Sequence, residues 1–139
     1  GAPGNSTNRG SAYLFFGSIS ILGAISAKNA NVAVAGGAAS DRFGWSVSGA
    51  GDMNKDGYDD VIIGAPGAGN KGYAYIFFGR PTWPSTLTTA SANVTITGTQ
   101  TGDLFGTSVS GIGDVDKDGF ADVLIGAPGN RSSQGAAYA

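Results

Sequence analysis

The sequence predicts an all-β protein built from a repeated four-stranded unit, and three observations lead to this prediction. The chain of 139 residues repeats itself with a period of 62, so that residues 51–67 (GDMNKDGYDDVIIGAPG) return as residues 113–129 (GDVDKDGFADVLIGAPG). Glycine occurs 25 times, and charged residues make up 13% of the chain, about half of their usual share in globular proteins. Short β-branched and aromatic runs alternate with Gly, Pro, Asn and Asp, which is typical of strands joined by tight turns.

Four strands are expected in one complete period, at residues 43–51, 60–66, 72–79 and 93–98. The same order predicts strands at residues 10–17 and 31–37 before this period, and at residues 105–113, 122–128 and 135–139 after it. The strand at residues 72–79 has apolar side chains at alternate positions on both faces. We therefore expect this strand to be covered on both sides.

A period of about 60 residues with four antiparallel strands, both faces buried, is typical of a β-propeller blade, with a sandwich as the alternative. On this division, residues 1–40 hold the last two strands of a first, incomplete blade, residues 41–98 form a complete blade with the first acidic loop, and residues 99–139 hold the first three strands of a further blade with the second acidic loop. About two blades cannot close a ring, and open strand edges favour association. The chain is therefore predicted to be part of a larger propeller or of a head-to-tail assembly.

The two acidic loops are the candidate metal sites, because eight of the ten aspartates lie in them. Side-chain oxygens stand at positions 1, 3, 5 and 9 of each loop: Asp52, Asn54, Asp56 and Asp60 in the first, and Asp114, Asp116, Asp118 and Asp122 in the second. The main-chain carbonyls at position 7, from Tyr58 and Phe120, would add a further ligand. Calcium takes six to eight oxygens at ~2.3–2.6 Å, so this spacing predicts two Ca²⁺ sites.

Other interpretations of the loops fit less well. An EF-hand needs a bidentate Glu at position 12, where this chain has Ile63 and Ile125. Magnesium prefers a smaller octahedral shell with several waters. Asp and Asn are also common turn residues, but a turn needs one such residue rather than four. Asp59, at position 8, is replaced by Ala121 in the second loop, so we expect it to face solvent.

Composition excludes several function classes. The chain has no Cys, His or Glu, so a thiol nucleophile, a Ser-His-Asp triad and an ordinary zinc site are absent, and we predict that it is not an enzyme. The net charge is −2 and the eight Lys and Arg residues are scattered, which argues against a nucleic-acid partner. No apolar stretch approaches the ~20 residues that a membrane span requires, so no membrane insertion is expected.

Each of the two repeats has Phe-Gly, an acidic loop and Gly-Ala-Pro in the same order. In this pattern the chain resembles the FG-GAP repeats of integrin α-subunit β-propellers and their microbial relatives. The resemblance implies propellers that usually have seven blades, calcium loops closed by the last aspartate, an extracellular or cell-surface location, and a structural or cell-adhesion role. It also implies a protein partner, or neighbouring copies of the chain joined through open blade edges.

Two alternative functions are also compatible with the sequence. Similar propellers accompany hydrolases such as phospholipases, so the chain could be the non-catalytic part of a larger secreted enzyme. It could also be the subunit of a self-assembling extracellular fibre, because its blades are incomplete.

Three Asn-X-Ser/Thr sequences, at Asn5, Asn93 and Asn130, are candidate N-glycosylation sites. Asn5 and Asn130 fall in equivalent loops on the rim opposite the acidic loops. The resemblance implies that relatives bind partners on that rim, so glycans there would obstruct this mode of recognition.

Overall fold

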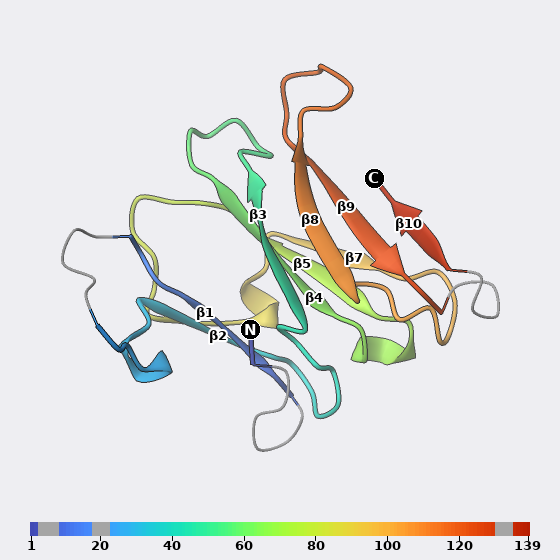
Figure 1. Cartoon of the computed structure of the whole chain (residues 1–139), viewed down its shortest axis with the longest axis horizontal. Helices are drawn as coiled ribbons and strands as arrows, with labels where there is room; N and C mark the ends of the chain where they lie inside the picture. Colours follow the sequence, from blue (N-terminus) through green and yellow to red (C-terminus); the bar gives the residue numbers. More distant parts are fainter. Residues whose placement is uncertain (3–8, 18–22, 130–134) are drawn as a thin grey trace.

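The structure is a computed structural model, and it describes residues 1–2, 9–17, 23–129 and 135–139. These residues form three β-sheets that stand side by side (Figure 1). The central sheet has four strands in the order β3 (Ser46–Gly51), β4 (Asp60–Ala65), β5 (Tyr73–Phe77) and β7 (Val94–Thr97), and each strand is antiparallel to its neighbour. This sheet is the four-stranded unit that the repeat predicts.

The flanking sheets contain parts of the same unit. One consists of β1 (Ser11–Leu14), β2 (Val32–Ala35) and β6 (Thr86–Thr88), and the other of β10 (Ala136–Tyr138), β9 (Asp122–Ala127) and β8 (Ser108–Gly113). In the described part of the chain, the connections contain the single-turn 3₁₀-helices η1 (Ala27–Asn29), η2 (Ala68–Asn70) and η3 (Thr89–Ser91). Within the described residues no helix has the length and apolarity needed to cross a membrane. The predicted all-β class is confirmed.

Strand β6 has no counterpart among the strands predicted from the sequence. It lies in the connection between β5 and β7 and pairs in parallel with β2, which becomes the middle strand of the neighbouring sheet. A three-residue strand has little pattern of its own, and this one exists because a neighbouring strand edge is available to it. It forms the one parallel pair among the described strands, whose other pairs are antiparallel as predicted.

Two hydrophobic clusters lie between the three sheets, one at each junction, and β5 contributes side chains to both. Tyr75 and Phe77 belong to the cluster between the first and central sheets, whereas Ala74 and Ile76 belong to the cluster between the central and third sheets. The prediction that both faces of this strand are covered is therefore confirmed. Burial of such side chains contributes ~25 cal/mol per Å² of apolar surface, so this two-sided packing is the main term that holds the sheets together.

The two junctions between sheets are built in the same way. The Phe43 N–H donates to the Arg9 carbonyl at 3.2 Å, and the equivalent Phe105 N–H donates to the Lys71 carbonyl at 3.0 Å. Both rings are buried, with 0% exposure for Phe43 and 3% for Phe105. The 62-residue period of the sequence is therefore also a period of the inter-sheet contacts.

Candidate metal centre

The two acidic loops join β3 to β4 and β8 to β9, and they project from the same side of the molecule (Figure 1). Each loop begins at a β-bulge, between Gly49 and Gly51 in the central sheet and between Gly111 and Gly113 in the third. The φ angle is positive at Gly51 (70°). A bulge at the end of a strand changes the direction of the chain, which turns the acidic segment back over the hairpin.

The first loop is tightened by its own side chains. The two Asp52 carboxylate oxygens accept from the Asp56 N–H at 3.1 Å and the Gly57 N–H at 2.8 Å. The Asn54 side-chain oxygen accepts from the Asp56 N–H at 3.1 Å, and the Asp56 carboxylate accepts from the Tyr58 N–H at 2.9 Å. Oxygens at positions 1, 3 and 5 therefore fold the loop inward.

The second loop has the same bonds at positions 62 residues later. Asp114 accepts from the Asp118 N–H at 3.1 Å and from the Gly119 N–H at 2.8 Å. Asp116 accepts from the Asp118 N–H at 3.1 Å, and Asp118 accepts from the Phe120 N–H at 2.8 Å. The loop conformation is thus a property of the repeat.

Three carboxylates of the second loop meet at one point. Asp114, Asp116 and Asp122 each offer an oxygen atom, and these oxygens lie within 4.8 Å of one another. It is the only such group of three acidic side chains in the described part of the chain. The first loop has Asn54 in place of Asp116, which leaves it one carboxylate short.

The geometry of this group fits calcium. Two oxygens bound to one Ca²⁺ at ~2.3–2.6 Å can be at most about 4.6–5.2 Å apart, so a group contained within 4.8 Å can share one ion. All three donors are hard carboxylate oxygens, the type that calcium prefers. At such separations, like charges repel by about 1 kcal/mol per pair in water and by about 4 kcal/mol at an effective dielectric of 20.

Other predicted site residues lie outside this group. Asp118 is not one of the three clustered carboxylates. The side chains of Tyr58 and Phe120 are 43% and 39% exposed, and the role of their carbonyls as ligands stays a prediction. Asp59 is exposed, in agreement with the expectation that it faces solvent.

Asp60 has a structural role that the sequence did not indicate. Its side chain is completely buried, and its two oxygens accept from the Met53 N–H at 2.9 Å and from the Gly79 N–H at 2.7 Å. The second of these bonds ties the first loop to the chain that follows β5. The equivalent Asp122 accepts from the Val115 N–H at 2.8 Å and is only half-buried.

The two loops also touch each other, through Lys55. Its ammonium group donates to the Asp118 carbonyl at 3.1 Å and lies 3.7 Å from the centroid of the Phe120 ring. The Ala121 N–H donates to the Asp52 carbonyl at 3.3 Å in the same region. The sequence places a lysine at the same position of both loops (Lys55 and Lys117), but it does not indicate this role of Lys55, because the contact joins two loops that are 63 residues apart.

Of the three candidate glycosylation sites, Asn5 and Asn130 lie outside the described residues. Asn93 is exposed at the start of β7, where its side-chain oxygen accepts from the Phe78 N–H at 2.9 Å. Its modification stays a prediction.

The fold and the loops together define the class of protein: stacked antiparallel blades, of which the central one has four strands, with an acidic loop between β3 and β4 and another between β8 and β9. The model of the FG-GAP repeat matches residues 43–77 and 105–139, which together make up half of the chain. The chain therefore belongs to the FG-GAP repeat family, and its sheets are β-propeller blades in an open arrangement.

The chain is similar to integrin α subunits. It is 41% identical over 88 residues to integrin alpha pat-2 of Caenorhabditis briggsae, which covers 62% of this chain and 7% of that protein. It is 37% identical over 106 residues to integrin alpha-5 of Xenopus laevis (69% of this chain, 10% of that protein) and 41% identical over 91 residues to human integrin alpha-11 (64% and 8%). The matched region thus spans a tenth or less of the length of these relatives.

Proposed function

We propose that this chain is a calcium-binding, non-catalytic FG-GAP module with a structural or cell-adhesion role at the cell surface or outside the cell. The observation that carries the proposal is the group of three carboxylates, Asp114, Asp116 and Asp122, whose oxygens lie within 4.8 Å of one another. Such a group is repulsive without a cation and is stabilised by one.

Two calcium ions are proposed, one in each acidic loop. The remaining ligands would be Asp118 and the Phe120 carbonyl in the second loop, and Asp52, Asn54, Asp56, Asp60 and the Tyr58 carbonyl in the first. Because the first loop has an amide at position 3, we expect it to bind calcium more weakly. When bound, each ion would supply positive charge that holds the hairpin loop in one conformation.

The proposed location and role are supported by similarity to integrin α subunits. Extracellular modules often bind calcium at ~10⁻⁴–10⁻³ M, an affinity suited to a calcium-rich environment. A protein partner, or further copies of the chain at open blade edges, would complete the assembly. N-glycosylation at Asn5, Asn93 and Asn130 belongs to the same proposal.

The test is thermal and urea unfolding with calcium and with a chelator. Ten millimolar Ca²⁺ should stabilise the folded chain by about 1.4–2.7 kcal/mol per site if the dissociation constant is ~0.1–1 mM. Magnesium at the same concentration is the control and should stabilise the chain much less. Identical unfolding curves in calcium and in chelator would rule out the proposal.

A further inference from the structure

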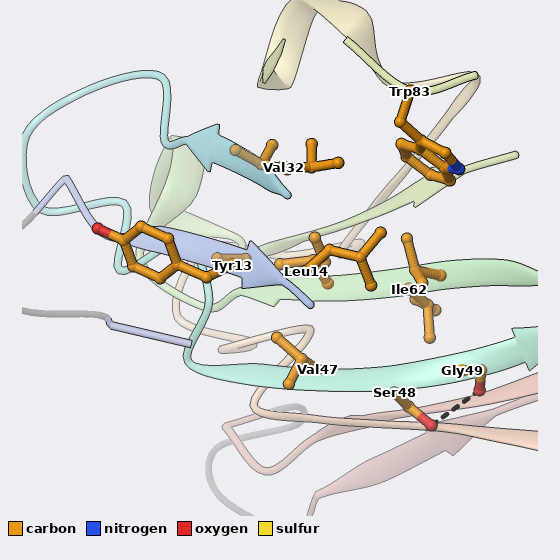
Figure 2. Close-up of a pocket in the computed structure, with 12 residues that line it drawn as sticks. Tyr13, Leu14, Val32, Val47, Ser48, Gly49, Ile62 and Trp83 are labelled. Carbon is orange, nitrogen blue, oxygen red and sulfur yellow. Dashed lines mark hydrogen bonds between the residues drawn. The ribbon is translucent and has the colours of Figure 1, made fainter. Parts of the chain in front are cut away.

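The two acidic loops lie against each other because the strands beneath them are joined. The Ser48 hydroxyl of β3 donates to the Gly49 carbonyl at 2.8 Å, the bond drawn as a dashed line in Figure 2, and accepts from the Gly111 N–H of β8 at 3.3 Å. No side chain fits at Gly111, because an added Cβ atom would collide with the Gly49 carbonyl. This close approach of β3 to β8 continues into the loops, where the Ala121 N–H donates to the Asp52 carbonyl at 3.3 Å.

Lys55 is the side chain that crosses from the first loop to the second. Its ammonium group donates to the Asp118 carbonyl at 3.1 Å and lies 3.7 Å from the centroid of the Phe120 ring. Both residues are proposed ligands of the second calcium ion, Asp118 through its carboxylate and Phe120 through its carbonyl. A positive charge from the first loop is therefore fixed against the ligand set of the second loop.

The contact acts on the second loop through charge rather than by covering a ligand. The oxygen that accepts from Lys55 is the main-chain oxygen of Asp118, which is not among the proposed ligands. The face of the Phe120 ring attracts the ammonium group and holds it in place. In the described part of the chain, Lys55 forms no ion pair with the three clustered carboxylates, which are Asp114, Asp116 and Asp122.

An ammonium group held beside a cluster of carboxylates acts differently on the empty loop and on the loaded loop. It attracts the carboxylates of the empty loop, and it repels a doubly charged ion in the loaded loop. Both effects favour the empty loop, so both lower the affinity for calcium. Residues 114–120 are exposed, so water and salt reduce the effect without removing it.

We propose that Lys55 of the first loop sets the calcium affinity of the second loop by weakening it about three- to tenfold, an inference that rests on the proposed calcium function of the loops. The second loop has a carboxylate at position 3, where the first loop has Asn54, so its ligand set favours tighter binding. Lys55 offsets part of this difference. The two loops are thereby brought toward the same range of calcium concentration.

The effect does not require calcium in the first loop. The ammonium charge of Lys55 is present whether that loop is empty or loaded, so the second loop is weakened in both cases. Lys55 binds no ion itself and acts through its charge. If its contacts served stability alone, replacing its charge would leave the calcium affinity of the second loop unchanged.

A calcium titration that resolves the two loops tests the inference. Gly57 and Gly119 stand at position 6 of the first and second loops, and their N–H groups donate to Asp52 and Asp114, both at 2.8 Å. Calcium bound by these aspartates would alter both hydrogen bonds, so the heteronuclear NMR signals of the two glycines report on the two sites separately. The remaining signals show that each variant keeps the fold.

Two substitutions of Lys55 separate its charge from its hydrogen bond. Lys55→Gln removes the charge but keeps a side-chain N–H group for the Asp118 carbonyl. We expect it to tighten calcium binding at Gly119 about three- to tenfold and at Gly57 less than about twofold at low ionic strength. Lys55→Arg keeps the charge and should leave the affinity of the second loop within about twofold of that of the unsubstituted chain. High salt should reduce the effect of Lys55→Gln, because it screens the charge.

Lys117→Gln is the matched control. Lys117 stands at the same position of the second loop, its φ angle is 64° against 59° for Lys55, and within the described residues its ammonium group makes no contact with another loop. This variant should change binding at either glycine by less than about twofold. Titration with trivalent terbium gives a further measure, because repulsion grows with ionic charge. The logarithm of the fold-change caused by Lys55→Gln should be about one and a half times that for calcium.

The outcomes separate this inference from the calcium proposal. If neither glycine signal responds to calcium in any variant, the calcium proposal is wrong and this inference is wrong with it. If both signals respond but Lys55→Gln leaves the affinity of the second loop unchanged or weakens it, the loops bind calcium and Lys55 does not set the affinity. Equal tightening by Lys117→Gln would also overturn the inference, because the contact between the loops would then not matter.

Discussion

The ammonium group of Lys55 lies 3.7 Å from the centroid of the Phe120 ring and 3.1 Å from the carbonyl oxygen of Asp118, so a side chain of one acidic loop contacts the next loop. The contact also blocks space, because a Cβ atom added at Gly119 would lie 2.6 Å from the Lys55 nitrogen. The two candidate metal loops are therefore one connected surface.

The first prediction concerns this contact. Lys55→Met should lower the free energy of unfolding by about 0.5–1 kcal/mol, the usual strength of an exposed cation–π pair. Lys117→Met is the matched control, because Lys117 stands at the same position of the second loop. It should change the free energy of unfolding by less than about 0.5 kcal/mol. Urea unfolding in the presence of a chelator measures the free energy of unfolding of both variants. Equal losses for the two variants would show that the contact contributes nothing.

The second prediction concerns the charge of the two loops. Asp116→Asn gives the second loop the ligand set of the first, so its calcium affinity should fall about tenfold, whereas Asn54→Asp should raise the affinity of the first loop by a similar factor. Calorimetric titration of each variant with calcium measures the change. Opposite or absent changes would mean that position 3 does not contribute a ligand.

Single-site variants provide the control for that assignment. Asp118→Ala should weaken only the second site and Asp56→Ala only the first, so each variant should keep one site with unchanged affinity. Simultaneous loss of both sites in either variant would mean that the contact through Lys55 couples calcium binding in the two loops.

The third prediction separates the structural role of Asp60 from calcium binding. Asp60→Ala leaves the Met53 and Gly79 N–H groups without their acceptor, and each unsatisfied buried group costs about 1–3 kcal/mol. We expect a loss of about 2–5 kcal/mol in chelator, and a loss below about 0.5 kcal/mol for the neighbouring, exposed Asp59→Ala. If both variants lose a similar, small amount of unfolding free energy in chelator, Asp60 contributes to stability only by binding the ion.

The fourth prediction concerns alkaline pH. Burial raises the pKa of Tyr75 from 10.0 to about 12, with smaller contributions from the charge of Asp41 and from Tyr73. Above pH 10 the tyrosine ionises in the unfolded chain before it ionises in the folded chain, so unfolding releases a proton. The stability that Tyr75 contributes is complete below pH 10 and is lost as the pH rises through 12, with a slope of up to about 1.4 kcal/mol per pH unit.

The measurement is urea unfolding between pH 9 and pH 11.5 for the unsubstituted chain and Tyr75→Phe. The difference in stability between the two should shift in favour of the phenylalanine variant as the pH rises. A difference that does not change with pH would show that Tyr75 ionises as readily in the folded chain as in the unfolded chain.

The sequence by itself determined the repeat, the order of the strands and the position of the acidic loops. These features depend on contacts between residues close in the chain: the hairpin of β3 and β4 and the bonds from Asp52 to the Asp56 and Gly57 N–H groups all lie within one period. Short-range contacts leave a pattern in composition and spacing, so the all-β class and the ligand candidates are predictable from the amino-acid order alone.

The tertiary structure decided everything that depends on how one sheet lies against the next. Three contacts join segments that no local pattern connects. They are the parallel pairing of β6 with β2, the contact of Lys55 with the second loop, and the hydrogen bond from the Gly79 N–H to Asp60. Phe15 and Phe77 have nearly the same sequence context, but Phe77 is 0% exposed because it belongs to the hydrophobic cluster between the first and central sheets, whereas Phe15 lies outside that cluster and is 41% exposed. Burial depends on what stacks against a strand, and stacking is a property of the assembled blades rather than of any single repeat.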